Sequence, residues 1–328
     1  MIIAEIGSVH DGSLGNALKL VDLAKKCKAD CVKFQYHIAE EETLKDAPEP
    51  YYFKDETRYN YFKRIEFSIT EWKQIIQRCK KNNIQFMCSV FSEKSLHNLV
   101  KFGVKNIKIP SGELTNIFLL KSLNKYKNIN LFISTGMGSW HEINAALKVL
   151  KSKKITLMQC TSLYPCPPEM AGINVIKEMK KKYSKNFEYG FSDHTQGNEA
   201  AILAMSAGAT VFEKHLTFSR KMYGSDAKFA MEPDEFSKYV IGLKKTKKIL
   251  KSFLDKNKIG LFSKMKKVFE KKIILKENKK KGYRLKENDI MLMKSKTGIF
   301  SKDLKKIIGK KLKRNLASKT PIKLSDIY

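Results

Sequence analysis

Eight short apolar segments alternate with helix-like segments along the first three quarters of the chain, and this alternation constrains the fold more than any other feature. The segments between them, such as ALKLVDLAKKC and EWKQIIQRCKK, have the 3.6-residue period of amphipathic helices. Eight strand–helix units in succession predict an α/β fold of the (β/α)8 TIM-barrel type. The expected strands are residues 2–8, 30–35, 84–91, 106–112, 130–136, 155–162, 188–193 and 210–217.

A doubly wound parallel sheet is the competing architecture for such a chain. It is disfavoured because no GxGxxG follows the first expected strand, and no GxxxxGK[ST] occurs anywhere. An insertion over residues 36–69, rich in acidic residues and tyrosines, follows the second strand. This position is a βα loop, so we expect the insertion on the face where barrels build their active sites.

The pattern changes after residue 255, where a lysine-dense stretch without a clear period gives way to short strands and turns. We therefore predict a barrel over residues 1–255, a linker over 256–275 and a small β-rich domain over 276–328. A domain of this size buries too little apolar surface to be more than marginally stable alone. We expect it to dock on another surface.

Charge and composition narrow the classes of partner. The formal net charge is +31, but only six of the 64 basic residues are arginine, and the lysines are spread over the outer faces of expected helices. Dedicated nucleic-acid binders concentrate charge and use arginine for bidentate contacts. We therefore expect no nucleic-acid and no membrane partner, whereas an anionic small-molecule substrate suits the charge.

Targeting signals and cysteine motifs point to an ordinary cytoplasmic protein. The N-terminus MIIAEIGSVHDG has neither a basic region nor a long apolar run, and no segment is long and apolar enough to span a membrane. None of the six cysteines forms a CxxC pair, so we expect reduced thiols and neither a disulfide nor a zinc site.

Every expected strand ends in polar side chains, and in a barrel these positions indicate catalysis. His194 and His215 end two successive strands, which lie about 4.8 Å apart when they are neighbours, so the pair could share one divalent metal ion. Lysines beside serines suit a phosphate and a carboxylate on one small ligand. No Ser/His/Asp or Cys/His triad spacing stands out. The other strand-end candidates are Glu5, Lys33, Ser89, Lys108, Ser111, Glu113, Ser134, Ser162, Tyr164, Ser192 and Glu213.

Eight motifs, in order along residues 2–235, together resemble the sialic acid synthase family, which includes the N-acetylneuraminate, legionaminate and pseudaminate synthases. The tail, from LKENDIMLMKSKTGIF to the C-terminus, resembles the family's antifreeze-protein-like (β-clip) domain. The resemblance covers nearly the whole chain. The motifs are AEIGSVHDGS, VKFQ, KIPSGE, STGM, CTSLYPCPPE, GFSDHTQG, FEKHLTF and MYGSDAKFAMEPDE.

The resemblance implies a metal-dependent enzyme that condenses phosphoenolpyruvate with an N-acylated mannosamine-type sugar to a nine-carbon 2-keto acid. The metal is Mn²⁺ or Mg²⁺, and the implied assembly is a domain-swapped homodimer whose small domains lid the partner barrels. His194 and His215 match metal ligands, and Glu5, Glu113 and Asp226 match positions near the sugar, where either glutamate could move the proton. The positions that match the phosphoenolpyruvate site are Lys33, Ser89, Lys108, Ser111, Ser134, Ser162, Tyr164 and Ser192.

The chain departs from the family pattern at several of these motifs. Val9 stands where the family has asparagine, Cys166 where threonine is common, and Ser162 where some members have asparagine. Ala227 stands where the family has a histidine. Lys294 aligns with the family's substrate-facing arginine, and a lysine cannot form the fork-like pair that an arginine forms.

Two other functions stay open from the sequence. Another (β/α)8 lyase or aldolase would use Lys33 or Lys108 as a Schiff-base nucleophile, which requires a lowered pKa. A non-catalytic carbohydrate-binding protein on the same fold is the third possibility, and the complete set of strand-end carboxylates, lysines and histidines argues against it. Among synthases, the SGE and EKHLTF segments favour the neuraminate or legionaminate type, with the pseudaminate type as the alternative.

Overall fold

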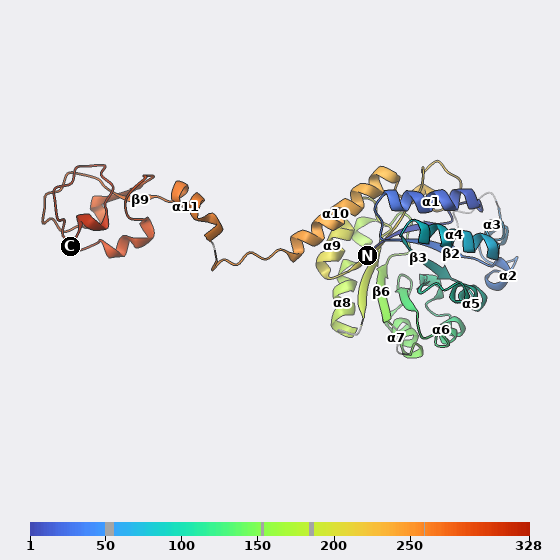
Figure 1. Cartoon of the computed structure of the whole chain (residues 1–328). Coiled ribbons are helices and arrows are strands. Elements are labelled where there is room, and N and C mark those ends of the chain that lie inside the picture. The colour runs from blue at the N-terminus through green and yellow to red at the C-terminus, as the bar shows by residue number, and fades with distance from the viewer. Residues whose placement is uncertain (50–55, 152–153, 184–186, 259) are drawn as a thin grey trace. The chain divides into compact units, whose positions relative to one another are not determined.

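The computed structural model describes residues 1–49, 56–151, 154–183, 187–258 and 260–328 (Figure 1). The chain divides into two compact units, Met1–Lys251 and Ser252–Tyr328. Each unit has its own hydrophobic core, and each is described by itself below. Residues 50–55 of the expected 36–69 insertion lie outside the described residues.

The first unit is a closed barrel of eight parallel strands in sequence order, with β1 hydrogen-bonded to both β2 and β8 (Figure 1). The predicted (β/α)8 architecture is therefore confirmed. The strands are β1 (Ile2–Gly7), β2 (Cys31–Tyr36), β3 (Gln85–Val90), β4 (Asn106–Ile109), β5 (Asn130–Ser134), β6 (Lys154–Cys160), β7 (Glu188–Ser192) and β8 (Val211–His215).

Helices surround the strands, and serine caps start several of them. Ser68 and Ser139 each form a capping box with a glutamate three residues on, so unpaired backbone N–H groups find acceptors. Across the described ranges, no helix is long and apolar enough to cross a bilayer. The α-helices are α1 (Leu14–Lys26), α2 (Ala39–Glu42), α3 (Arg58–Arg64), α4 (Ile69–Lys81), α5 (Glu93–Lys101), α6 (Ile117–Leu123), α7 (Trp140–Val149), α8 (Ile173–Tyr183), α9 (Glu199–Ala207) and α10 (Pro233–Lys251). Short 3-10 turns include η1 (Ser111–Glu113), η2 (Pro168–Met170) and η4 (Ala227–Phe229).

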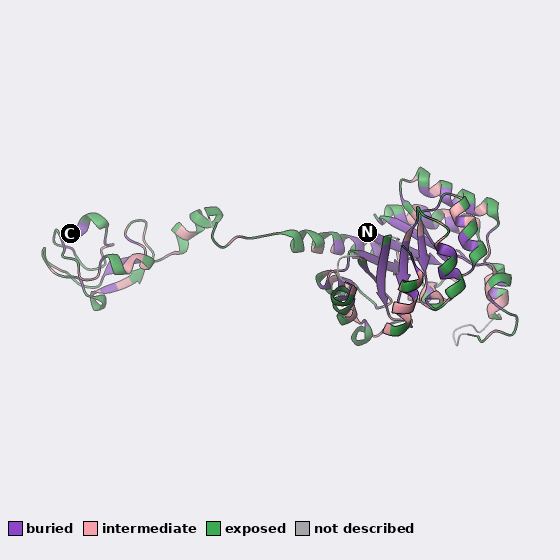
Figure 2. Cartoon of the chain, turned by 90° about the horizontal axis from the view of Figure 1, so that it is seen from below, coloured by how far each residue is buried: buried purple, intermediate pink, exposed green. Residues whose placement is uncertain are grey.

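Apolar side chains fill the barrel interior toward the amino-terminal ends of the strands. Alternate residues of a barrel strand face inward, and the outward residues pack against the helices, which explains why most strand residues are buried (Figure 2). The interior plug consists of Ile3, Cys31, Met87, Phe132, Met158 and Val211. This plug fills the barrel interior toward the amino-terminal ends of the strands. A cavity inside the barrel can therefore open only toward the carboxyl-terminal ends.

The second unit contains a two-stranded antiparallel sheet, β9 (Lys272–Leu275) with β10 (Ile290–Met293), over a separate apolar core. The predicted linker over 256–275 is therefore wrong at its end, because β9 belongs to this sheet and α11 (Ser263–Phe269) lies within the same stretch. The apolar run Ile273–Leu275 is short and surrounded by lysines, so it was not recognised as a strand. The described residues of this unit also include four 3-10 turns: η5 (Gly260–Phe262), η6 (Glu287–Asp289), η7 (Ser301–Lys306) and η8 (Leu324–Asp326). The resemblance of this unit to an antifreeze-protein-like domain stays a prediction.

Gly298 has a structural role within the second unit. Its φ of 109° lies in the region that favours glycine, and a Cβ there would lie 3.0 Å from Pro321 Cβ. Glycine at this position therefore lets the backbone lie close to Pro321 of the same unit.

Candidate active site

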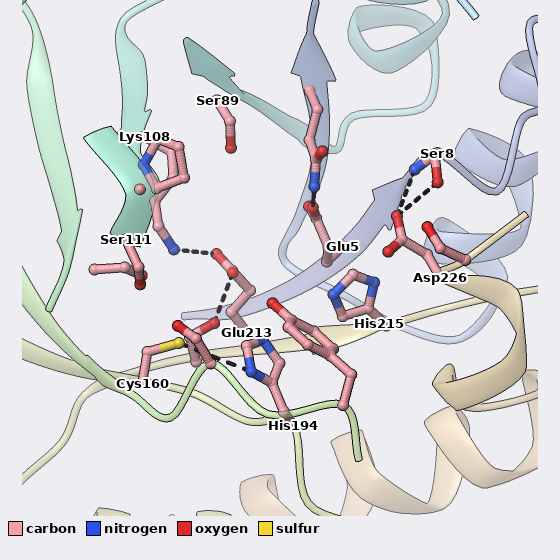
Figure 3. Close-up of a pocket in the computed structure, with 18 of the residues that line it drawn as sticks. Glu5, Ser8, Ser89, Lys108, Ser111, Cys160, His194, Glu213, His215 and Asp226 are labelled. Atoms are coloured by element: carbon pink, nitrogen blue, oxygen red, sulfur yellow. Dashed lines mark hydrogen bonds and ion pairs between the residues drawn. The ribbon is translucent and has the colours of Figure 1, made fainter. Parts of the chain in front are cut away.

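A cavity of about 370 Å³ lies at the carboxyl-terminal ends of the barrel strands, and all eight strands contribute to its lining. Of the fourteen side chains predicted for the site, twelve line this cavity, and Figure 3 shows most of them around it. Those that line it are Glu5, Lys33, Ser89, Lys108, Ser111, Ser134, Ser162, Tyr164, Ser192, His194, His215 and Asp226.

The floor of this cavity consists of strand side chains that point into the barrel two residues beyond the apolar plug. Each residue of the apolar plug is followed, two positions later on the same strand, by a side chain that lines the cavity. The plug and this second layer therefore share one inward face. The register aligns the layer across strands, pairing Glu5 with Lys33 and with His215, and Ser192 with Glu213. The six positions two residues beyond the plug are Glu5, Lys33, Ser89, Ser134, Cys160 and Glu213.

Glu213 joins the two predicted phosphate-site lysines. Its Oε2 lies 2.7 Å from Lys108 Nζ and its Oε1 lies 2.9 Å from Lys33 Nζ, and all three side chains are nearly inaccessible to solvent. Ser192 Oγ donates a 2.9 Å hydrogen bond to Glu213 Oε1. Burial alone would raise the pKa of Glu213, but the two lysines outweigh burial and hold that pKa below its usual range.

The two lysines differ in electrostatic environment. Burial would lower the pKa of Lys33, but Glu213 and Glu5 together raise it above the ordinary value. At Lys108 burial prevails over the attraction of Glu213, so its pKa is lowered. A second anion entering the cavity would therefore stabilise the charged form of Lys108.

Glu5 is a buried carboxyl group with an unusual proton affinity. Its Oε1 accepts a 2.7 Å hydrogen bond from Gln35 Nε2, and its Oε2 lies 3.4 Å from Lys33 Nζ. Burial raises the pKa of Glu5 to about 7, in spite of the lowering effect of Lys33. A carboxyl group with such a pKa can hold or release a proton near neutral pH, as a general acid or base must.

His194 and His215 lie next to each other in the cavity lining, with ring centroids 5.9 Å apart (Figure 3). His194 Nδ1 donates a 2.7 Å hydrogen bond to the Thr161 carbonyl oxygen, which leaves Nε2 for another partner. His215 Nδ1 is buried and makes no hydrogen bond with any described residue. Burial lowers the pKa of His215 to about 4, so this imidazole is neutral at physiological pH.

These two imidazoles fit a divalent metal ion. A backbone hydrogen bond that fixes one ring nitrogen and leaves the other free is the usual support for a metal-binding histidine. Among the described residues, no group of three or more His, Cys, Asp and Glu side chains is arranged to hold a metal. The histidines could therefore hold an ion whose remaining ligands come from water or substrate.

The loop after β8 approaches the loop after β1 through Asp226. Asp226 Oδ2 accepts hydrogen bonds from the Ser8 backbone N–H at 2.7 Å and from Ser8 Oγ at 2.8 Å (Figure 3). Gly7 is required beneath it, because a Cβ at this position would lie 2.2 Å from Asp226 Oδ2 and the φ of Gly7 is +53°. The AEIGS motif therefore provides the room in which Asp226 reaches the cavity.

The barrel matches a known protein family. The family model described as the NeuB family matches residues 20–254, which is most of the barrel. The chain belongs to the NeuB family. The resemblance to the sialic acid synthases that the motifs predict is thereby confirmed.

Individual members of the NeuB family match over nearly the whole chain. The chain is 33% identical to an N,N'-diacetyllegionaminic acid synthase of Campylobacter jejuni, covering 96% of both proteins. It is 31% identical to the N,N'-diacetyllegionaminic acid synthase of Legionella pneumophila, over 98% of this chain and 92% of that protein. The solved N-acetylneuraminic acid synthetase of Leptospira borgpetersenii, in complex with citrate, matches with a TM-score of 0.70 and 31% identity, over 82% of this chain and 91% of that one.

Of the two other predicted site residues, Glu113 belongs to the barrel but does not line the cavity, and Lys294 belongs to the separate second unit. Glu113 lies on η1, where its Oε2 accepts a 2.7 Å hydrogen bond from Asn116 Nδ2, and burial raises its pKa. Lys294 belongs to the second unit, where its Nζ lies 5.1 Å from the centroid of the Phe269 ring. Glu5 is therefore the carboxyl group of the predicted catalytic pair that faces the cavity.

Sequence reasoning missed the roles of two cavity residues. Glu213 was recognised as a strand-end carboxylate without a function, although its position two residues before His215 places both on one face of β8. Cys160, the last residue of β6, also lines the cavity, and its Sγ lies 3.8 Å from His194 Nδ1. Burial would raise the pKa of this thiol, and His194 instead lowers it to about 7.

Proposed function

We propose that this chain condenses phosphoenolpyruvate with an N-acylated mannosamine-type sugar, giving a nine-carbon 2-keto acid and phosphate. The observation that carries the proposal is the pair of buried lysines on Glu213, surrounded by serines and adjacent to two histidines in one cavity. Relatives named as legionaminic acid synthases, at 33% and 31% identity, favour the legionaminate or neuraminate type over the pseudaminate type.

Phosphoenolpyruvate carries a phosphate and a carboxylate, and the lysine–serine layer provides donors for both. Lys33 on β2 and Lys108 on β4 both reach into the cavity and are both oriented by their ion pairs with Glu213. The serine hydroxyls around them donate hydrogen bonds without adding charge. Because the cavity floor is closed by the apolar plug, the bound anion is shielded from water on that side. The proposed donors are Ser89, Ser111, Ser134, Ser162 and Ser192.

We propose that His194 and His215 hold Mn²⁺ or Mg²⁺ at the cavity wall. When bound, such an ion polarises the sugar aldehyde and lowers the pKa of a bound water. Tyr164 lies beside both rings, at centroid distances of 4.1 Å from His194 and 6.1 Å from His215. Its ring would therefore restrict the orientation of the sugar next to the histidines.

The reaction joins C3 of phosphoenolpyruvate to C1 of the sugar aldehyde, water adds at C2, and phosphate leaves. The aldehyde oxygen must gain a proton and the attacking water must lose one. Glu5 is the candidate for moving this proton, because it faces the cavity and has a pKa of about 7. Asp226 is the candidate for the sugar hydroxyls, since its carboxylate is already positioned by Ser8.

We further propose that the protein acts as a domain-swapped homodimer in which the second unit of one chain lids the barrel of its partner. The support is the resemblance of the tail and the small size of its core, which ten buried side chains form. Lys294 would then offer a single charged donor to the sugar of the partner barrel.

Phosphate release provides the test. The protein is incubated with Mn²⁺, phosphoenolpyruvate and each of a panel of N-acylated mannosamine-type sugars, and phosphate is measured against a sugar-free control. The account expects release that depends on both substrates, and a Lys108→Met variant whose KM for phosphoenolpyruvate is raised about 10- to 100-fold, as loss of a charge-assisted hydrogen bond predicts. Sugar-independent release, or wild-type kinetics of the variant, would contradict the assignment.

A Schiff-base lyase or aldolase is the second candidate, favoured by the lowered pKa of Lys108. Its Nζ, however, lies 2.7 Å from a carboxylate that stabilises the charged, non-nucleophilic form. Borohydride reduction in the presence of a carbonyl substrate separates the two. Covalent trapping on Lys108 supports the lyase, whereas the condensation predicts an unmodified protein.

A further inference from the structure

A chain of hydrogen bonds runs from α2 to the cavity floor. Both carboxylate oxygens of Glu42 lie 3.1 Å from His37 Nδ1, and His37 Nε2 lies 3.1 Å from Gln35 Oε1. Gln35 Nε2 then donates a 2.7 Å hydrogen bond to Glu5 Oε1. This series of hydrogen bonds connects the insertion after β2 with Glu5, the carboxyl group proposed to move the proton.

The direction of donation along these hydrogen bonds determines which nitrogens of His37 are protonated. An ionised carboxylate only accepts, so Nδ1 of His37 donates to Glu42. The amide of Gln35 turns its N–H group to Glu5 and therefore presents its carbonyl oxygen to His37. Nε2 must also donate, and an imidazole that donates from both nitrogens carries a positive charge.

The surroundings of His37 stabilise such a charge. Only 4% of its side chain is exposed, and the ring is stacked between Phe62 and Phe91, with both centroid distances 4.1 Å. A cation between two aromatic faces is attracted by both, most strongly when water is excluded. The charged and titratable groups near His37, besides Glu42, include Glu113 on η1 and His10 in the loop after β1. Arg58 on α3 is also near, with its guanidinium carbon 5.7 Å from the centroid of the Phe62 ring.

We propose that His37 is a positioning residue: held as a double donor by Glu42, it locks the Gln35 amide so that its N–H group points at Glu5. The amide of Gln35 has two ends of opposite polarity and nearly equal shape. Without a donor at His37, the amide gains by turning its own N–H group toward the ring. Glu5 would then face a carbonyl oxygen, which repels a carboxylate and tolerates only the protonated acid.

The arrangement also gives the insertion a role in the site. Phe62 on α3 and Phe91 after β3 line the cavity and hold His37 by stacking, while α2 supplies Glu42. The orientation of Gln35 therefore depends on the insertion being folded against the barrel.

Nitrogen NMR of the full-length ¹⁵N-labelled chain without substrates tests the protonation of His37 directly. The His37 signals are assigned by their loss in His37→Phe. The proposal expects both ring nitrogens in the protonated range near neutral pH. In Glu42→Gln, which keeps an acceptor for Nδ1 but removes the negative charge, Nε2 should lose its proton. An unprotonated ring nitrogen in the wild-type protein overturns the proposal.

Enzyme kinetics provides a second test of the positioning role of His37, and this test rests on the proposed function. His37→Phe keeps an aromatic ring between Phe62 and Phe91 but removes both donors. We expect kcat to fall about 10- to 100-fold, as for a misplaced catalytic group, with the KM for phosphoenolpyruvate changed less than twofold. The matched control is His97→Phe on α5, whose exposed ring shares a 3.2 Å hydrogen bond with the Tyr126 hydroxyl.

The two arms fail in different ways. Wild-type kcat in His37→Phe overturns the positioning role even if the condensation is confirmed. If no sugar supports turnover, the proposed function fails, and the NMR measurement still decides the charge and hydrogen-bond polarity of His37. A fall in melting temperature shared by His37→Phe and His97→Phe, without a fall in kcat specific to His37→Phe, would show a purely structural role and also overturn the proposal.

Discussion

Lys108 and Glu213 form an ion pair at the centre of the barrel, with Nζ and Oε2 2.7 Å apart and both side chains at most 5% exposed. Lys33 completes the arrangement from the other side of the carboxylate. Glu5 also lies 3.4 Å from Lys33. While Glu5 is protonated, Glu213 is the one carboxylate between the two lysines, and the resulting net positive charge of this cluster favours binding of a second anion.

Glu213→Gln should therefore destabilise the fold and weaken phosphoenolpyruvate binding together. Removing one member of a buried charge pair costs about 3–5 kcal/mol, because the remaining charges are uncompensated. Urea unfolding measures this loss, and Glu188→Gln is the matched control, since Glu188 pairs with Lys154 on the surface. That control should stay within about 0.5 kcal/mol of the wild type. Equal stability of both variants would show that Glu213 does not hold the lysines.

The position of most site residues could be predicted from the sequence because strand periodicity determines it. Once a strand and its end are recognised, the inward positions follow at intervals of two, and a closed barrel brings the strand ends together. Lys33, Lys108, His194 and His215 were found in this way and line one cavity.

The partners of these side chains could not be predicted, since they depend on register between strands and on loop conformation. Glu213 bonds two lysines from β2 and β4, which lie far from it in sequence. Glu113 follows β4 closely but turns to Asn116 within its own loop. The strand at Lys272–Leu275 was missed because only four residues form it among many lysines.

Metal removal should abolish turnover. His215→Ala should lose the bound ion, measured by elemental analysis of the purified protein, while keeping the circular dichroism spectrum of the wild type. Activity lost on chelation should return with Mn²⁺ or Mg²⁺. His97→Ala, on an exposed helix position, serves as the control and should bind metal normally. Full activity after exhaustive chelation would exclude the proposed ion.

Stability should fall in mild acid because of His10. Burial lowers the pKa of His10 to about 3, and its Nδ1 accepts a hydrogen bond from the Gly12 N–H group. The folded protein therefore favours the neutral imidazole of His10. This contribution to the free energy of unfolding is fully present above a pH of about 6.5, the pKa of histidine in the unfolded chain. It is lost as the pH falls below that value, because the unfolded chain then binds a proton that the folded protein does not. Between pH 7.5 and 5.5 the wild type should lose about 1.4 kcal/mol more than His10→Asn in urea unfolding. Parallel losses in the two proteins would mean that His10 is not the group responsible.

The second unit should be needed for activity across two chains. Truncation after Lys251 should remove most turnover, and Lys294→Ala should raise the sugar KM more than the phosphoenolpyruvate KM. Mixing the truncated chain with full-length His215→Ala tests the exchange, because the intact barrel of the truncated chain would receive the second unit of the other. Partial activity is expected. A heterodimer shown to form but lacking activity would contradict the domain-swapped lid.

Mass spectrometry of the product is the most direct test of the condensation. The wild-type protein is incubated with Mn²⁺, phosphoenolpyruvate and an N-acylated mannosamine-type sugar, and the reaction is analysed for new acids and for phosphate. The account predicts one product whose mass equals that of phosphoenolpyruvate, sugar and water less phosphoric acid, formed in equal amount with phosphate. Pyruvate together with unchanged sugar, or no new acid with any sugar of the panel, would contradict it.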